Sequence, residues 1–226
     1  MQSLQRNRRL ATIVGLIFAL GWPAIFPIVQ HRQQDLGNVK QDFGIIVLEW
    51  TALIVLFGIV LFWERLNPLD STGFVRPKHI DLAIVGGLVV LAAIVTAVLA
   101  HAHITMPRKG NMLAQALDVP VALRIALVVT AGICEEAFFR GYALERLRAL
   151  TGNIWVGALI GTALFTAAHI PRYGLSVGLI GVAATGAVLS AIYVWRRNLL
   201  PCIALHCFLD GMSLLAIPAV VTFVGK

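Results

Sequence analysis

The chain has 226 residues, of which 59% are hydrophobic and 13% are charged, and its mean hydropathy is +0.86. Soluble domains are closer to half apolar and a quarter charged, so the composition excludes an ordinary soluble protein. The formal net charge of +7 fits basic loops beside anionic headgroups, and no nucleic-acid-binding motif accompanies it. The partners expected from composition are therefore membrane lipids, and no nucleic acid.

Seven stretches approach the roughly 20 mostly apolar residues that a membrane-spanning helix needs. In chain order they cover about residues 10–29, 43–63, 82–102, 119–150, 153–170, 174–195 and 199–224. A split of the last stretch near Gly211 or Pro218 gives eight. The sequence therefore predicts an all-α fold, a polytopic transmembrane helical bundle of seven or eight spans, with residues 1–226 forming a single integral-membrane domain.

The first residues are basic and the following ones are apolar, which resembles a signal peptide. The apolar run is long and more membrane-like sequence follows it, so we interpret it as an uncleaved first span. With the N-terminus inside, the inner segments carry more Lys and Arg than the outer ones. This bias predicts a cytoplasmic N-terminus in a multi-pass protein.

Ionisable side chains inside membrane spans are rare and usually functional. Those within the predicted spans are Glu49, Arg124, Glu135, Glu136, His169, His206 and Asp210. Glu49 lies near the start of the second span and is interpreted as interfacial, with a position lining the site as the alternative. Arg124 is interpreted as a snorkelling or paired residue. The remaining acids and histidines are the candidates for a site.

The adjacent glutamates of the fourth span, Glu135 and Glu136, face different directions on a helix. Residues four apart share a face, so Arg140 can neutralise Glu136. Glu135 points about 100° away and has no such partner on its own helix. We therefore expect Glu136–Arg140 to be a structural ion pair and Glu135 to be the chemically active acid.

Two further pairs with the same spacing follow, Phe165 with His169 and His206 with Asp210. At about 1.5 Å per residue, Glu135 and His169 each lie about 24–27 Å from the turn between their spans. They should therefore sit at similar heights in the membrane. The third pair falls in the same half of the bilayer if residues 145–150 project beyond it, which predicts one convergent polar site.

Several chemistries can use such a site. A carboxylate and a histidine can activate a water molecule, and a His/Asp pair can stabilise an oxyanion. The same side chains could instead bind Zn²⁺, although no HExxH motif is present. No serine lies in a GxSxG frame, so a serine nucleophile is unsupported.

These three elements, EExxxR at 135–140, FxxxH at 165–169 and HxxxD at 206–210, occur in this order. They resemble the three motifs of the CPBP family, the CAAX proteases and bacteriocin-processing enzymes, also called the Abi family. The resemblance covers about residues 119–215. Each motif alone is weak, but the ordered set at membrane depth is specific.

The resemblance implies an intramembrane endopeptidase that cleaves a membrane-associated or lipidated protein or peptide. Its implied catalytic residues are Glu135 and His169, which activate water, and His206 and Asp210, which stabilise the oxyanion; its supporting residues are Glu136, Arg140 and Phe165. Family members are described as both metal-dependent and glutamate-based. We expect no cofactor, with Zn²⁺ the less favoured alternative.

Two other functions stay open at the level of sequence. A proton-coupled transporter could use the same acids and histidines as a relay, although no inverted repeat is evident. A catalytically inactive immunity or scaffold protein could have the same fold. Many family members occur in prokaryotes and the loops are short, so the expected location is a prokaryotic cell membrane.

Overall fold

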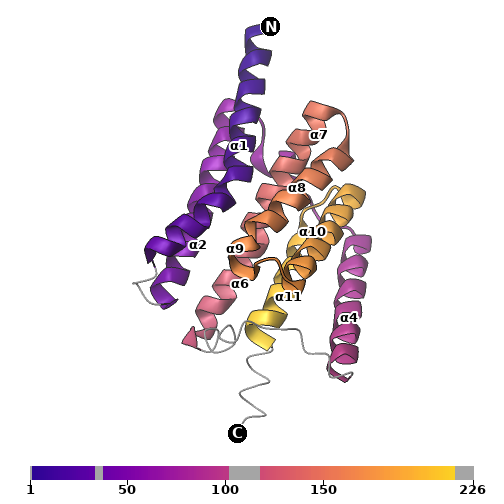
Figure 1. Ribbon diagram of the computed structural model, residues 1–226. Helices are drawn as coiled ribbons and strands as arrows, with labels where there is room; N and C mark the ends of the chain where they lie inside the picture. The colour runs from indigo at the N-terminus through magenta and orange to yellow at the C-terminus, as the bar shows by residue number, and fades with distance from the viewer. Residues whose placement is uncertain (1, 34–37, 102–117, 217–226) are drawn as a thin grey trace.

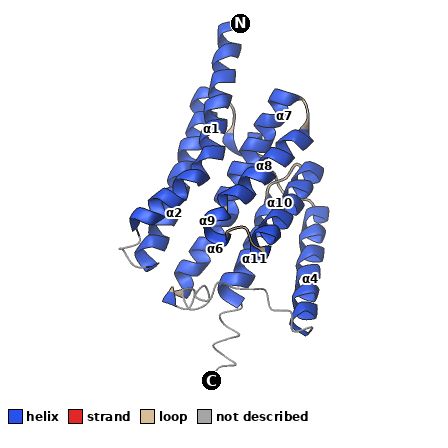
Figure 2. Cartoon of the chain, viewed as in Figure 1, coloured by secondary structure: helices blue, strands red, loops and turns tan. Residues whose placement is uncertain are grey.

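Every regular element of the described chain is helical. The computed structural model describes residues 2–33, 38–101 and 118–216, and no β-strand occurs within these ranges (Figure 2). The predicted all-α fold is therefore confirmed. The expected count of seven or eight spans stays a prediction.

The longer helices are α1 (Gln2–Gln33), α2 (Asn38–Gly58), α4 (His79–His101), α6 (Val121–Glu136), α7 (Glu145–Thr151), α8 (Ile154–Ala168), α10 (Val177–Arg196) and α11 (Leu200–Gly211). Short helical turns are α3 (Pro68–Ser71) and α9 (Ile170–Tyr173), and π-helical segments are η2 (Ile59–Trp63), η3 (Ala137–Leu144) and η4 (Met212–Ala216). Each π-helical segment continues directly from the α-helix before it, so α6, η3 and α7 form one continuous helix.

Within the described residues the predicted spans fall on helices, and the structure adds two details. The residues before Gly174 form the helical turn α9, and the chain turns only at this glycine, whose φ is 61°. No split occurs at Gly211, because α11 passes into η4 without leaving helical conformation. Pro218, the other position considered for a split, lies outside the described residues.

The helices run side by side along a common direction (Figure 1). Helices α1 and α2 lie together on one side and α4 on the other, with α6, α8, α10 and α11 between them. The main packing partners are α8 with α10, α6 with α11 and α2 with α6. This arrangement brings the three segments that carry the sequence motifs into one core.

Close packing of α6 against α11 depends on Gly132. A Cβ atom at this position would collide with Sγ of Cys207 and would lie 3.4 Å from the Cys207 backbone nitrogen. The absence of a side chain therefore lets the two backbones approach each other one turn before the glutamate pair, which draws His206 toward it.

We expect Gly132→Ala to lower the stability of the protein by about 1–3 kcal/mol, the usual cost of overpacking a core. Thermal unfolding in detergent measures this loss. The double variant Gly132→Ala/Cys207→Ala removes the colliding sulfur and should recover most of the melting temperature. An unchanged melting temperature in Gly132→Ala alone would show that α6 and α11 are not closely packed here.

Residues 145–150 include both exposed and buried side chains, and their projection beyond the bilayer stays a prediction. Arg146 is only 7% exposed, because it donates a 2.6 Å hydrogen bond to Glu64 at the end of η2. Tyr142 and Thr12 donate to the same carboxylate, at 2.8 and 3.1 Å. The network ties η3 and α7, which continue α6, to α1 and to the end of η2.

A second network fixes the start of α4. Asp81 accepts hydrogen bonds from Arg196 and from the Lys78 backbone N–H, both at 2.6 Å, and from Asn198 at 3.2 Å. Burial alone raises the pKa of Asp81, but these donors and the Arg196 charge outweigh it, so the pKa lies below its ordinary value. The ion pair joins α4 to the end of α10.

Large apolar side chains cover much of the outer surface. Among the most exposed are Ile17, Ile54, Phe62, Leu159, Leu175 and Ile180. Soluble proteins rarely expose apolar surface on this scale, whereas lipid contact favours it. Two helical stretches of the described chain, Val39–Trp63 and Val177–Arg196, are long and apolar enough to cross a membrane, and shorter apolar helices cover His79–Leu91, Ile154–Ala168 and Leu200–Leu215.

Candidate active site

The glutamate pair lies at the junction of α6 and η3. The Glu136 side chain is completely buried, and its Oε1 accepts a 2.6 Å hydrogen bond from Nη1 of Arg140, which is 1% exposed. The Glu135 side chain is 23% exposed. The two acids therefore have different surroundings, as their different directions on the helix predict.

Arg140 connects η3, the segment to which it belongs, to α10. Its Nη2 donates to the Gly186 carbonyl at 3.1 Å, and its Nε lies 3.4 Å from Oγ of Ser190. Thr162 of α8 is within 2.9 Å of the same Ser190 hydroxyl. The sequence analysis did not identify these α10 and α8 contacts, because α10 carries no charge near the site; its small residues were the available signal.

Phe165 forms the apolar wall of the site. The Arg140 guanidinium carbon lies 4.4 Å from its ring centroid, and the rings of His169 and His206 lie 4.7 and 6.1 Å from it. Phe139 closes the other side with an edge contact at 5.3 Å. The aromatic ring therefore touches or faces members of all three sequence motifs.

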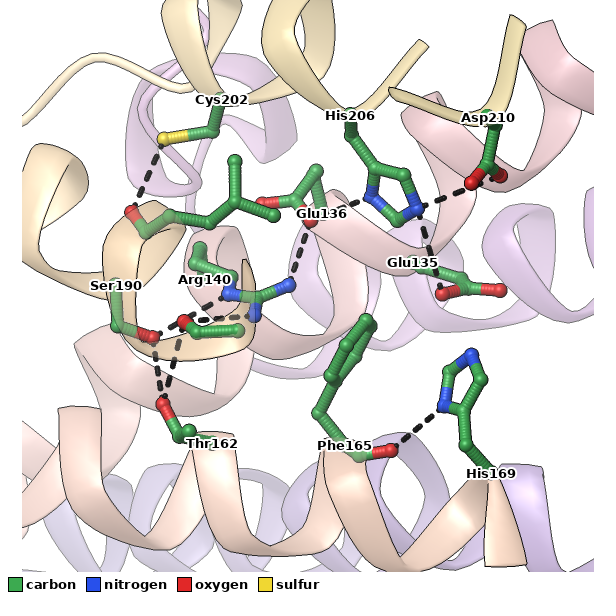
Figure 3. A network of polar contacts seen from close by, with 12 residues as sticks. Glu135, Glu136, Arg140, Thr162, Phe165, His169, Ser190, Cys202, His206 and Asp210 are labelled. Carbon is green, nitrogen blue, oxygen red and sulfur yellow. Dashed lines mark hydrogen bonds and ion pairs between the residues drawn. The ribbon is translucent and has the colours of Figure 1, made fainter. Parts of the chain in front are cut away.

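His206 reaches the glutamate pair from α11. Its Nδ1 lies 2.8 Å from Oε1 of Glu136, which is a hydrogen bond. Its Nε2 lies 3.9 Å from Glu135 and 3.7 Å from Asp210, which is too far for a hydrogen bond to either. The ring is thus anchored through one nitrogen, while the other faces two carboxylates (Figure 3).

His169 occupies the C-cap of α8. Its Nδ1 is 2.8 Å from the Phe165 carbonyl oxygen. A carbonyl can only accept, so Nδ1 carries the proton, and Nε2 has a free lone pair in the neutral ring. Figure 3 shows this ring on the same side of Phe165 as Glu135, and the charges of Glu135 and His169 interact.

The structure brings together the residues that the sequence predicts for the site. Glu135, Glu136 and Arg140 come from α6 and η3, Phe165 and His169 from α8 and its cap, and His206 and Asp210 from α11. Asp210 is 37% exposed and Glu135 is 23% exposed, whereas the other acid, Glu136, is fully enclosed. Their catalytic roles stay a prediction.

Glu49 of α2 is a further acid beside this site, where the sequence analysis places it at an interface. It is 7% exposed, and its Oε2 atom is buried without a hydrogen-bond partner. Its charge interacts with those of Glu135, His206 and Asp210. The signal available in the sequence was an acid within an otherwise apolar span.

No three His, Cys, Asp or Glu side chains within the described ranges are grouped as metal ligands. Glu136 Oε1 is already contacted by both Arg140 and His206. The arrangement holds His206 between carboxylates, and His169 is a second histidine opposite it.

Comparison with known proteins agrees with the motifs. Residues 117–212 match the family described as type II CAAX prenyl endopeptidase, Rce1-like. The resemblance to the CPBP family is therefore confirmed over this segment, which contains the seven predicted site residues. The family is one of membrane-embedded proteases. No curated protein and no solved structure matches the chain.

Proposed function

We propose, from the match of residues 117–212 to CAAX-type endopeptidases, that this protein is an intramembrane endopeptidase. It hydrolyses a peptide bond of a membrane-associated or lipidated protein or peptide. Glu135 and His169 activate the attacking water, while His206 and Asp210 support the oxyanion. Glu136, Arg140 and Phe165 hold these groups in place.

Proton transfer from water needs a base that is reachable and not already committed to a donor. The Glu135 side chain is 23% exposed and its Oε2 makes no hydrogen bond, and Nε2 of His169 keeps a lone pair because Nδ1 donates to the Phe165 carbonyl. In the proposed reaction the water oxygen attacks the carbonyl carbon and its proton passes to Glu135. The C–N bond then breaks, and the leaving nitrogen takes that proton.

The position of His206 carries this proposal. Glu136 binds Nδ1 and fixes the ring, while Nε2 lies between Glu135 and Asp210 without a hydrogen bond to either. A protonated Nε2 can therefore donate to a third acceptor, the developing oxyanion of the substrate. Asp210 orients the ring in this scheme, because an ionised carboxylate cannot itself donate a hydrogen bond.

We further propose that the reaction needs no metal ion. The expected result is that purified, active protein contains less than one zinc per chain by elemental analysis and keeps its activity after chelation. Stoichiometric zinc, with activity lost on chelation and recovered on its return, would assign the same side chains as ligands instead.

The proposed location is a prokaryotic cell membrane, with the N-terminus in the cytoplasm. The excess of Lys and Arg in the inner segments supports this orientation. Cysteine-accessibility labelling of intact cells, with single cysteines placed at the N-terminus and in the first outer loop, tests it.

The experiment that tests the function compares membranes containing wild-type protein with membranes containing Glu135→Ala. Peptides released from membrane proteins are identified by mass spectrometry, and fragments specific to the wild type reveal both the substrate and the cleavage site. A farnesylated peptide with a C-terminal CAAX sequence is the first defined substrate to assay. Equal fragment patterns in the two membranes would contradict the proposal.

A liposome assay separates the proposed peptidase from a proton-coupled transporter. Purified protein should produce no proton flux that depends on Glu135. Flux without peptide cleavage would favour the transporter, and neither activity would favour an inactive scaffold protein.

A further inference from the structure

Helix α2 places Glu49 beside the proposed site through a fixed contact with α6. Nε1 of Trp50 donates a 3.0 Å hydrogen bond to Oγ1 of Thr130, which sets the position of the two helices along each other. The α2 face that contains Glu49 continues into the buried residues Ala52, Leu53 and Leu56. Glu49 therefore points into the core and away from lipid.

The carboxyl of Glu49 has no partner of its own. Its Oε2 atom is buried without a hydrogen bond, and a buried polar atom in this condition costs free energy until a donor or acceptor reaches it. The cations of the site are already engaged, since Arg140 and His206 both contact Glu136. The charged groups nearest to Glu49 include two further acids, Glu135 and Asp210.

The titratable groups whose charges act on Glu49 lie on α6 and α11. From α6 they are Glu135 and the Cys134 thiol, and from α11 they are His206 and Asp210. The described α1 side chains buried in the same core, Leu16 and Ala19, do not titrate. Three acids around one histidine cannot all be ionised cheaply in a water-poor site, so one of them must carry a proton. Glu49 is the acid without a cationic partner and the most deeply buried of the three.

We propose that Glu49 is a further catalytic residue, which carries a proton and donates a hydrogen bond to the scissile carbonyl oxygen as that oxygen becomes negative. This inference rests on the proposed peptidase function. The Glu49 proton stays on Glu49 throughout the reaction, and the proton taken from water by Glu135 leaves with the amine product. Glu49 and His206 then stabilise the same oxyanion from α2 and α11.

The test uses two substitutions that separate hydrogen-bond donation from ionisation. Glu49→Gln keeps a donor that does not titrate, so cleavage of the defined peptide should stay within about tenfold of the wild type. Glu49→Leu removes the donor at similar size, so kcat/KM should fall by about 10²–10³-fold, the usual effect of losing one oxyanion donor. The matched control is Asp118→Leu, which makes a similar acid-to-leucine change at an exposed residue just before α6.

The pH profile gives a readout that a packing role would not change. In the wild type, activity should fall at alkaline pH as Glu49 loses its proton; in Glu49→Gln this fall should move to higher pH, because His206 is then the only one of the two oxyanion donors that can lose its proton. Full activity in Glu49→Leu, or an inactive but folded Glu49→Gln, would overturn the proposal. A wild-type profile without any alkaline fall would overturn it even if a variant failed to fold.

Comparison of Glu135→Gln with the Glu49 variants separates the proposed role of Glu49 from the proposed peptidase function. If Glu135→Gln is inactive while every Glu49 variant is normal, the peptidase stands and Glu49 is a structural residue. If Glu135→Gln is fully active, the peptidase mechanism itself fails.

Discussion

Glu135→Gln should leave a folded protein that no longer cleaves its substrate. Glutamine keeps the shape of the side chain but cannot accept the proton of the attacking water. Loss of a positioned general base usually costs about 10²–10⁴-fold in rate. Stability should change little, because Oε2 of Glu135 has no hydrogen bond to lose and its contact with Nε2 of His206 is a long one, at 3.9 Å.

The measurement is cleavage of the defined peptide together with thermal unfolding in detergent. Asp118→Asn is the matched control, since it makes the same acid-to-amide change at an exposed residue just before α6. Near-normal turnover in a folded Glu135→Gln would show that the base lies elsewhere and would remove the basis of the proposed mechanism.

Glu136→Gln should damage both stability and rate. It leaves the Arg140 guanidinium buried without its carboxylate, and removing one partner of a buried pair costs about 3–5 kcal/mol. It also weakens the anchor of His206, whose Nδ1 contacts the same oxygen at 2.8 Å. The two substitutions are therefore expected to have different effects. Glu135→Gln removes the catalytic base, whereas Glu136→Gln destabilises the fold around Arg140 and His206.

The control for this variant is Arg148→Gln, which breaks an ion pair with Glu145 in which the arginine is 46% exposed. Exposed pairs contribute at most about 1 kcal/mol, so the melting temperature should barely move. A folded Glu136→Gln of normal stability, with cleavage abolished, would reverse the roles assigned to Glu135 and Glu136.

The features of the site that depend only on the spacing of residues along one helix could be predicted from the sequence. Pairs four residues apart on a helix share a face whatever surrounds them, so Glu136–Arg140 could be anticipated from spacing alone. One convergent site for Glu135 and His206 was also expected, on the condition that residues 145–150 project beyond the bilayer, and the side-chain atoms of these two residues lie 3.9 Å apart.

The sequence did not predict contacts that depend on how helices pack. Gly186 and Ser190 bind Arg140 through a backbone carbonyl and a hydroxyl, and neither residue type signals a site inside an apolar helix. The ion pair of Arg146 with Glu64 was not predicted, because its partner lies 82 residues earlier in the chain. Glu49 was placed at an interface because rotation of α2 cannot be read from a span that is apolar on every side.

The position of the Glu136–Arg140 pair in the sequence also determines when, during synthesis, each part of the site can form. The ribosome makes α6 and η3 before α8, α10 and α11, and these two segments contain both members of the pair, so the buried acid has its counter-ion before the later helices exist. The other contacts of the pair arrive later, when Gly186 on α10 binds Arg140 and His206 on α11 binds Glu136. A nascent chain that ends before α11 thus holds a neutralised, membrane-compatible glutamate but an incomplete site. The site can therefore be complete only after α11, which carries His206 and Asp210, has been synthesised and has docked.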